Sequence, residues 1–131
     1  MEKVIEFLKA HHTYYLATMN GDQPEVRPFG TAALFEGKLY IQTGMSKDVF
    51  RQIQANPKVS ICCFDGQSTW LRLNATAVID ERAEASAAVL AEYPELQHMY
   101  APGDGNCVVV ALTEATARFC SFTQPEEVVT F

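Results

Sequence analysis

The stretch LYIQTGMSKDVFRQIQANP, residues 39–57, decides the fold because its hydrophobic period changes halfway along. Its first part, Leu39–Thr43, is an apolar and aromatic run typical of a strand. Ser46 can then cap a helix, and Asn56-Pro57 ends that helix because the residue before a proline is pushed out of the helical region. The apolar face of the helix consists of Val49, Phe50 and Ile53.

The residues before this stretch predict one helix and the beginning of an antiparallel sheet. The helix is expected at Glu2–His11, where apolar residues recur at helical spacing. Strands are expected at Tyr14–Met19 and Glu25–Phe35, joined by a hairpin turn at Asn20-Gly21-Asp22. With Leu39–Thr43 as the third strand, we expect a meander in which the second and third strands lie side by side.

The residues after this stretch predict more strands and a further helix. Strands are expected at Lys58–Asp65, Thr69–Glu81, Cys107–Leu112 and Ala115–Phe122, and an alanine-rich helix at Arg82–Glu92. Apolar residues alternate with polar ones along Thr69–Glu81, which predicts one buried and one exposed face. The pattern predicts a mainly β fold with flanking helices, of the α+β or barrel class, in a single domain over residues 1–131.

The composition is that of an ordinary globular protein and argues against two classes of partner. Hydrophobic residues make up 48% of the chain and charged residues 20%, which argues against disorder. With a net charge of −6 and scattered Lys and Arg, neither nucleic acid nor a membrane surface is an expected partner. No apolar stretch approaches the roughly 20 residues of a membrane span, and no secretory signal pattern opens the chain. We therefore expect a cytoplasmic protein.

Cysteine and histidine residues form no pattern typical of a metal or catalytic site. The cysteines are Cys62, Cys63, Cys107 and Cys120, without a C-x-x-C pair. We expect reduced, buried thiols. The histidines, His11, His12 and His98, have no ligand spacing with cysteines or carboxylates. We expect no metal site, and the catalytic residues stay unknown because no triad can be assembled from the order of residues.

The turn Thr43-Gly44-Met45-Ser46-Lys47 is a candidate phosphate site because it leads straight into a helix. A helix N-terminus presents unpaired N–H groups and a partial positive charge. Thr43 and Ser46 add hydroxyl groups, and Lys47 adds a mobile positive charge. In the alternative interpretation, Ser46 is only a cap and Lys47 is an ordinary solvated lysine.

Three residues outside this turn are further candidates. Arg27 stands in an otherwise apolar strand and needs a partner if its face is covered. As a guanidinium it suits phosphate, and from a neighbouring strand it could reach the same ligand. Alternatively, it is a surface arginine on an exposed edge, which the adjacent Pro28 favours. Trp70 and Arg72 share one strand face and could pack on a flat heteroaromatic ring or on the edge of a core.

The order of motifs resembles the pyridoxamine 5'-phosphate oxidase-like FMN-binding split-barrel family, in particular its nitroimidazole-resistance and general-stress branch. The motifs are Tyr15–Thr18, Glu25–Gly30, Leu39–Thr43, Ser46-Lys47 and Asn56–Ser60. The resemblance implies an antiparallel split β-barrel and a homodimer with FMN at the subunit interface.

The resemblance also implies the site residues. Arg27, Thr43, Ser46 and Lys47 would hold the FMN phosphate, Pro28, Phe29 and Gln42 would lie beside the ligand, and Trp70 and Arg72 would contact the flavin. True pyridoxamine phosphate oxidases have a lysine where this chain has Ala32, so vitamin B6 oxidation is not expected. We expect an FMN-dependent oxidoreductase or flavin reductase acting on an unknown small molecule. The alternatives are a non-catalytic flavin-binding or sensing module and haem binding on the same barrel.

Overall fold

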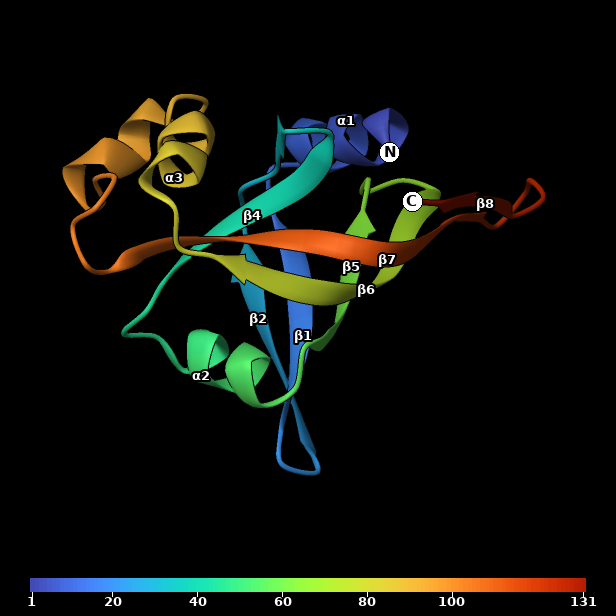
Figure 1. The fold of residues 1–131 in the computed structure, drawn as a ribbon. Helices are drawn as coiled ribbons and strands as arrows, with labels where there is room; N and C mark the ends of the chain where they lie inside the picture. The colour runs from blue at the N-terminus through green and yellow to red at the C-terminus, as the bar shows by residue number, and fades with distance from the viewer.

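The computed structural model describes residues 1–131 as a strongly curved sheet with three α-helices and one short 3₁₀ helix around it (Figure 1). The helices are α1 (Glu2–Ala10), α2 (Asp48–Ala55), α3 (Ala83–Leu90) and the 3₁₀ helix η1 (Pro94–His98). The strands are β1 (Tyr14–Asn20), β2 (Gln23–Phe29), β3 (Ala33–Phe35), β4 (Lys38–Gly44), β5 (Lys58–Phe64), β6 (Thr69–Asp80), β7 (Cys107–Ser121) and β8 (Glu127–Thr130). None of the helices has the length and apolar character needed to cross a membrane.

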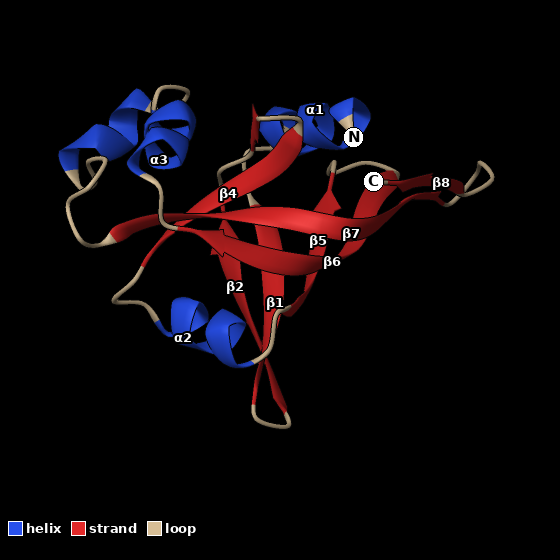
Figure 2. Cartoon of the chain, viewed as in Figure 1, coloured by secondary structure: helices blue, strands red, loops and turns tan.

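All strand pairs are antiparallel, and the sheet order is β2-β1-β5-β6-β7-β4-β3, with β8 added on β7. The end strands β2 and β3 do not pair with each other, so the sheet curls without closing. Figure 2 shows β1 and β2 running across the direction of β6 and β7, as the coiling of the sheet requires. The split-barrel fold and the mainly β class are thus confirmed.

The core fills the inside of this curved sheet. Along β6, Leu71, Leu73 and Ala75 are buried while Arg72 and Asn74 are exposed, as the alternation predicts. The helix α1 covers one end of the barrel and α2 the other (Figure 1). Their buried residues join the same cluster, Val4, Ile5 and Leu8 from α1 and Val49 and Ile53 from α2.

The predicted strand Glu25–Phe35 is wrong, because Gly30–Ala32 separates β2 from β3. β2 pairs only with β1, and β3 pairs with β4, so the expected pairing of the second and third strands is confirmed for Ala33–Phe35, whereas a continuous three-stranded meander is wrong. Hydroxyl groups hold the break. Tyr14 donates to the carbonyl of Thr31 at 2.6 Å, and the Tyr93 hydroxyl bonds both backbone groups of Ala32. These two tyrosines lie far from the break in the sequence, so no pattern in the residues around the break predicts it.

The predicted final pair of strands, Cys107–Leu112 and Ala115–Phe122, is a single strand, β7. Glu114 has a positive φ of 49°, and β7 holds one residue more than β6 between their paired positions there. The apparent turn is therefore a β-bulge, which bends a strand without ending it. The strand β8 and the helix η1 were not predicted. Ser46 does not cap α2, whose N-cap is Lys47 without a side-chain hydrogen bond.

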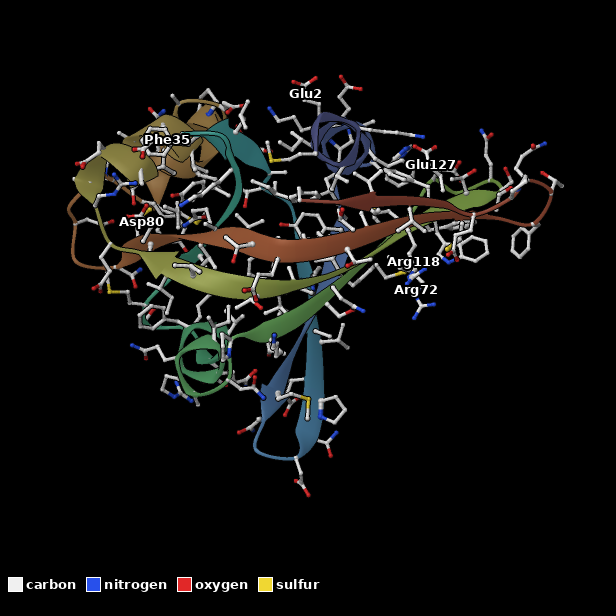
Figure 3. The ribbon with its side chains drawn as sticks, turned by 45° about the vertical axis from the view of Figure 1, so that its right-hand side comes forward. Glu2, Phe35, Arg72, Asp80, Arg118 and Glu127 are labelled. Carbon is white, nitrogen blue, oxygen red and sulfur yellow. The ribbon has the colours of Figure 1, made fainter.

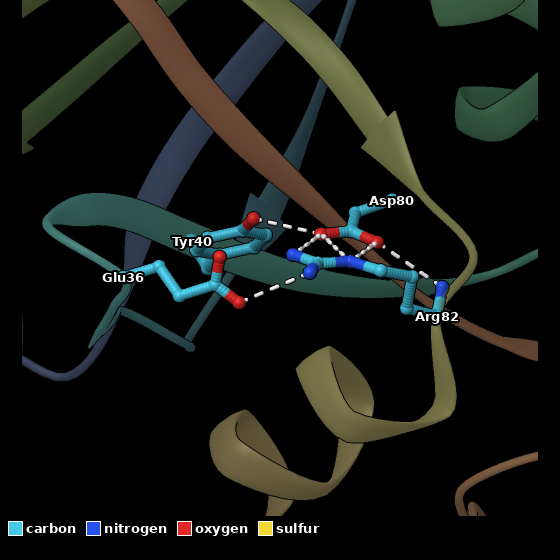
Figure 4. A network of polar contacts seen from close by, with 4 residues as sticks. All are labelled: Glu36, Tyr40, Asp80 and Arg82. Atoms are coloured by element: carbon cyan, nitrogen blue, oxygen red, sulfur yellow. Dashed lines mark hydrogen bonds and ion pairs between the residues drawn. The ribbon is translucent and has the colours of Figure 1, made fainter.

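A network of polar contacts fastens the start of α3 to the sheet (Figure 4). The Asp80 carboxylate accepts hydrogen bonds from the Arg82 guanidinium and from the Tyr40 hydroxyl, each at 2.8 Å. Arg82 also pairs with Glu36 at 3.0 Å. The Arg82 and Tyr40 bonds hold the pKa of Asp80 well below its usual range. This network positions α3, and α3 leads directly into η1.

We predict that Asp80→Asn lowers the free energy of unfolding at pH 7 by about 1.5–3 kcal/mol, the usual contribution of a hydrogen bond to a charged group. Because the folded-state pKa is depressed, this contribution is present above the unfolded pKa of about 3.9 and is lost as the pH falls toward the folded value. Urea denaturation from pH 7 to pH 3 measures it. The control is Glu81→Gln, an exposed neighbour without a hydrogen bond, and a constant difference between Asp80→Asn and the native chain down to pH 3 would contradict the prediction.

Candidate functional site

Two adjoining cavities form a cleft beside the break between β2 and β3. The β4 cavity, of about 430 Å³, lies between the ends of β2 and β4 and the segment around η1. The α2 cavity, of about 420 Å³, lies between β2 and the start of α2. Pro28, Phe29 and Lys47 line both cavities, so the two lie side by side. The structure brings seven of the nine predicted site residues to this cleft, namely Arg27, Pro28, Phe29, Gln42, Thr43, Ser46 and Lys47.

The turn between β4 and α2 is shaped by a loop from the other end of the chain. The Asn106 carbonyl accepts the Met45 N–H at 2.7 Å, and its side chain accepts the Ser46 N–H at 3.0 Å. Asp104 in turn accepts the Asn106 N–H at 2.8 Å, and such backbone bonds lower the pKa of Asp104. A Cβ at Gly44 would lie 3.2 Å from the Asn106 side chain, so glycine permits the close approach. The Ser46 N–H is therefore already paired, which leaves the Ser46 hydroxyl and the Lys47 ammonium as the ligand-facing donors of this turn.

Arg27 is half-buried and held from two sides. Its Nη1 donates to the Thr18 hydroxyl at 2.7 Å, and its Nη2 donates to the Gln52 side chain of α2 at 2.8 Å. Burial lowers the pKa of Arg27. β2 is an edge strand, as the alternative interpretation expected, but Arg27 is half-buried and bonded there. The expected route to the ligand through a neighbouring strand is wrong, because α2 rather than β4 faces Arg27. Arg27 also lines the α2 cavity, and its hydrogen bonds within the chain use Nη1 and Nη2.

Thr43 holds the one buried side-chain polar atom of the structure that lacks a hydrogen-bond partner, its Oγ1. Its neighbours are satisfied. The Gln42 N–H donates to the Thr31 hydroxyl at 2.9 Å, and the Gln42 side chain donates to the Thr43 carbonyl at 2.8 Å. A buried hydroxyl without a partner costs about 1–3 kcal/mol. Thr43 lines the β4 cavity, but its Oγ1 has almost no accessible surface, so the unpaired hydroxyl lies beneath the cavity wall.

Trp70 and Arg72 lie away from the cleft, on the outer face of β6. Neither lines the β4 or the α2 cavity. The Trp70 ring packs 5.0 Å from the Phe122 ring, and Arg72 is paired in register with Arg118 of β7. Figure 3 shows Arg72 and Arg118 next to each other, at the end of the sheet away from Asp80. Within one chain these two predicted residues therefore do not join the other seven.

One side of the β4 cavity was not predicted at all. It is the η1 wall, which comprises Tyr93, Glu95, Leu96, Met99 and Tyr100. In the sequence, only the expected end of the helix Arg82–Glu92 lay close to this segment. The histidines lie outside both cavities of the cleft, and no group of His, Cys, Asp and Glu side chains is arranged to hold a metal ion. Burial raises the pKa of the Cys63 thiol to about 11 and also raises that of Cys107, so neither is an activated nucleophile.

Known proteins resemble this chain in sequence and in fold. The family model described as pyridoxamine 5'-phosphate oxidase matches residues 1–121. A NimC/NimA family protein from Clostridium acetobutylicum is 39% identical with a TM-score of 0.96, over 100% of this chain and 92% of that one. General stress protein 26 from Bacillus anthracis is 18% identical with a TM-score of 0.76, over 99% and 97% of the two chains. A pyridoxamine 5'-phosphate oxidase-related, FMN-binding protein from Nostoc punctiforme is 15% identical with a TM-score of 0.65, over 99% and 93%. No curated protein matches in sequence.

We predict opposite effects from two matched threonine substitutions. Thr43→Val removes an unpaired buried hydroxyl at nearly constant volume and should raise the free energy of unfolding of the ligand-free protein by about 1 kcal/mol. Thr31→Val should lower it by about 1–3 kcal/mol, because the buried Gln42 N–H then loses its acceptor. Denaturant titration of both variants measures the pair. Equal destabilisation by the two would mean that the Thr43 hydroxyl has a partner in the protein.

Proposed function

The chain belongs to the pyridoxamine 5'-phosphate oxidase family, and on this premise we propose that it binds FMN in the cleft and acts as an FMN-dependent oxidoreductase. The two basic side chains of the α2 cavity carry the proposal, because Arg27 and Lys47 are brought together there beside the Ser46 hydroxyl. FMN has a phosphate at one end and a flat heteroaromatic ring at the other. The two cavities differ in a corresponding way, since the α2 cavity has two basic side chains and the β4 cavity has more apolar and aromatic ones.

The α2 cavity suits the phosphate. Arg27 and Lys47 are the basic side chains that line it, and Ser46 adds a hydroxyl. Arg27 is held in place by Thr18 and Gln52, so its guanidinium charge is preorganised beside the cavity. Two carboxylates, Glu25 and Asp48, line the same cavity, and Asp48 is paired with Arg51 at 2.7 Å. A guanidinium and an ammonium are the groups that proteins use most for phosphate.

The β4 cavity suits the ring. Its floor is the segment from Pro28 to Thr31, and Gln42 lines the same cavity. Bound FMN would supply hydride or electron transfer, while the protein binds and orients the ring and tunes its surroundings. Ala32, at the position of the lysine of true pyridoxamine phosphate oxidases, is 1% exposed in the core, so it supplies no charge to a ligand. This supports a reaction other than the oxidation of pyridoxamine phosphate.

Of the two alternatives, haem has little support in the cleft. An axial ligand would be needed, and none of His11, His12 and His98 lines either cavity. A flavin module without turnover would use the same residues as the enzyme. Anaerobic addition of NAD(P)H separates these two, since bleaching of the flavin followed by reoxidation with a quinone or nitroaromatic supports the enzyme.

We further propose a homodimer in which Trp70 and Arg72 of a second copy complete the cleft. The outer face of the sheet carries an aromatic patch, formed by Tyr15, Phe64, Trp70 and Phe122, and three of these are more than half exposed. Large exposed apolar patches mark interfaces. The two predicted flavin contacts that lie outside their own cleft belong to this same face, so packing of two copies through it accounts for both observations.

The purified protein is expected to show flavin absorbance and to release FMN, identified by mass, on denaturation. Lys47→Ala should weaken FMN binding about tenfold, because it removes a charged bond to phosphate, while riboflavin, which has no phosphate, should bind as before. The control is Lys38→Ala, at the start of β4 and outside both cavities. Fluorescence titration gives the dissociation constants. A colourless protein that ignores added FMN would overturn the proposal.

Light scattering is expected to give twice the mass of the chain. Phe64→Glu, which places a charge in the aromatic patch at a site already 51% exposed, should give monomers and weaker FMN binding. Leu34→Glu, at an exposed position of β3, should leave the dimer intact. A native monomer carrying one FMN would contradict the dimer and leave FMN binding standing.

A further inference from the structure

We propose that the η1 wall selects the substrate, and that it admits a flat uncharged or cationic compound and rejects anions, phosphate esters included. The inference rests on the proposed function and names the class of small molecule that would meet the flavin. Its basis is the position of the wall, its apolar surface and the distribution of charge along the cleft.

The η1 wall is hydrogen-bonded to Ala32, next to the floor of the cleft, at one end and lies against Gly44 of β4 at the other. At one end the Tyr93 hydroxyl donates to the Ala32 carbonyl at 3.0 Å and accepts the Ala32 N–H at 2.8 Å. At the other end the Tyr100 hydroxyl lies so close to Gly44 that a Cβ there would be 3.2 Å away. Between them, the Tyr100 N–H donates to the Leu96 carbonyl at 2.9 Å. The wall therefore stands at a fixed distance from the floor, as a substrate site opposite a flat ring requires.

The cavity side of this wall is apolar where it is most accessible. Met99 is 67% exposed although it is large and apolar, and Leu96 is half-buried. Both line the β4 cavity. Neither joins the two core clusters, so stability of the fold does not account for them. A methionine adapts its shape to flat ligands and makes favourable contacts with aromatic rings.

The α2 cavity is lined by Arg27 and Lys47 and also by the carboxylates of Glu25 and Asp48, of which Asp48 is paired with Arg51. Lys47 and Glu95 are the charged residues of the β4 cavity, and Lys47 also belongs to the α2 cavity, where Arg27 lies. A flavin phosphate held there would use both basic groups. A smaller cavity next to the η1 wall is lined by Glu92 and Glu95, and Glu92 is already paired with Lys9. Within one chain, Lys9 and Glu92 offset each other and His12 completes the polar lining of the smaller cavity, so a second anion at the wall would meet the unpaired carboxylate of Glu95, which disfavours it.

The selectivity of the η1 wall can be tested by measuring ligand binding in the absence of turnover. The FMN-loaded protein, fully oxidised, is titrated by calorimetry with 1,4-naphthoquinone and with its 2-sulfonate; both are oxidised, so no electrons move. We expect the neutral quinone to bind at least about tenfold more tightly, the factor that about 1.4 kcal/mol of charge repulsion gives. Met99→Ala and Leu96→Ala should weaken the neutral quinone about three- to tenfold. Glu95→Gln should bring the two ligands closer together in affinity.

Val78→Ala is the control, because this exposed apolar residue of β6 lines neither cavity of the cleft. The FMN content and the thermal melting of each variant are measured first, and Glu95→Gln keeps the test open if an apolar variant fails to fold. Equal affinities for the two quinones, or wall variants that match Val78→Ala, would overturn the inference alone. A protein that takes up no FMN would overturn it together with the proposed function.

Discussion

Everything in the cleft depends on the hydrogen bonds that Tyr14 and Tyr93 make to the backbone between β2 and β3. Tyr14 is fully buried, and burial raises the pKa of its hydroxyl well above the usual value, so it remains a donor at any physiological pH. Its bond to Thr31 fixes the end of β2, and the Thr31 hydroxyl in turn receives the N–H of Gln42 in β4. Tyr93 joins the η1 wall to the next residue, Ala32. The segment between β2 and β3 and the segment around η1 lie far apart in the sequence and thus meet at Ala32.

The parts of the fold that follow from local pattern could be predicted, and the parts held by distant residues could not. The alternation of β6 and the apolar face of α2 are properties of neighbouring residues, and both were confirmed. The break after Phe29 depends on two tyrosine side chains that no window around it contains. The bulge at Glu114 resembles a turn because only the partner strand β6 shows that pairing continues on both sides.

The site shows the same division. Residues that carry their chemistry in the motif, such as Lys47 and Thr43, could be singled out in advance, and the cleft contains them. Arg27 was chosen for its charge, but the expected route through β4 was wrong, since Gln52 of α2 and Thr18 of β1 hold it. The η1 wall escaped prediction because its residues form no periodic pattern, and they become a surface only when Tyr93 and Tyr100 place them opposite β4.

Rigidity and charge change together along the cleft, and this has a consequence for what stays bound. At the α2 end, Arg27 is fixed by two side chains, so a phosphate there would be met by a donor that loses little entropy. At the η1 end, the exposed Met99 and the carboxylate of Glu95 offer an adaptable apolar contact and no ion pair for an anion. A ligand with one anionic group therefore gains most of its binding free energy at the first end. A second, uncharged molecule at the other end would be held by contact area alone and would exchange readily, which is the arrangement a retained cofactor and a transient substrate need.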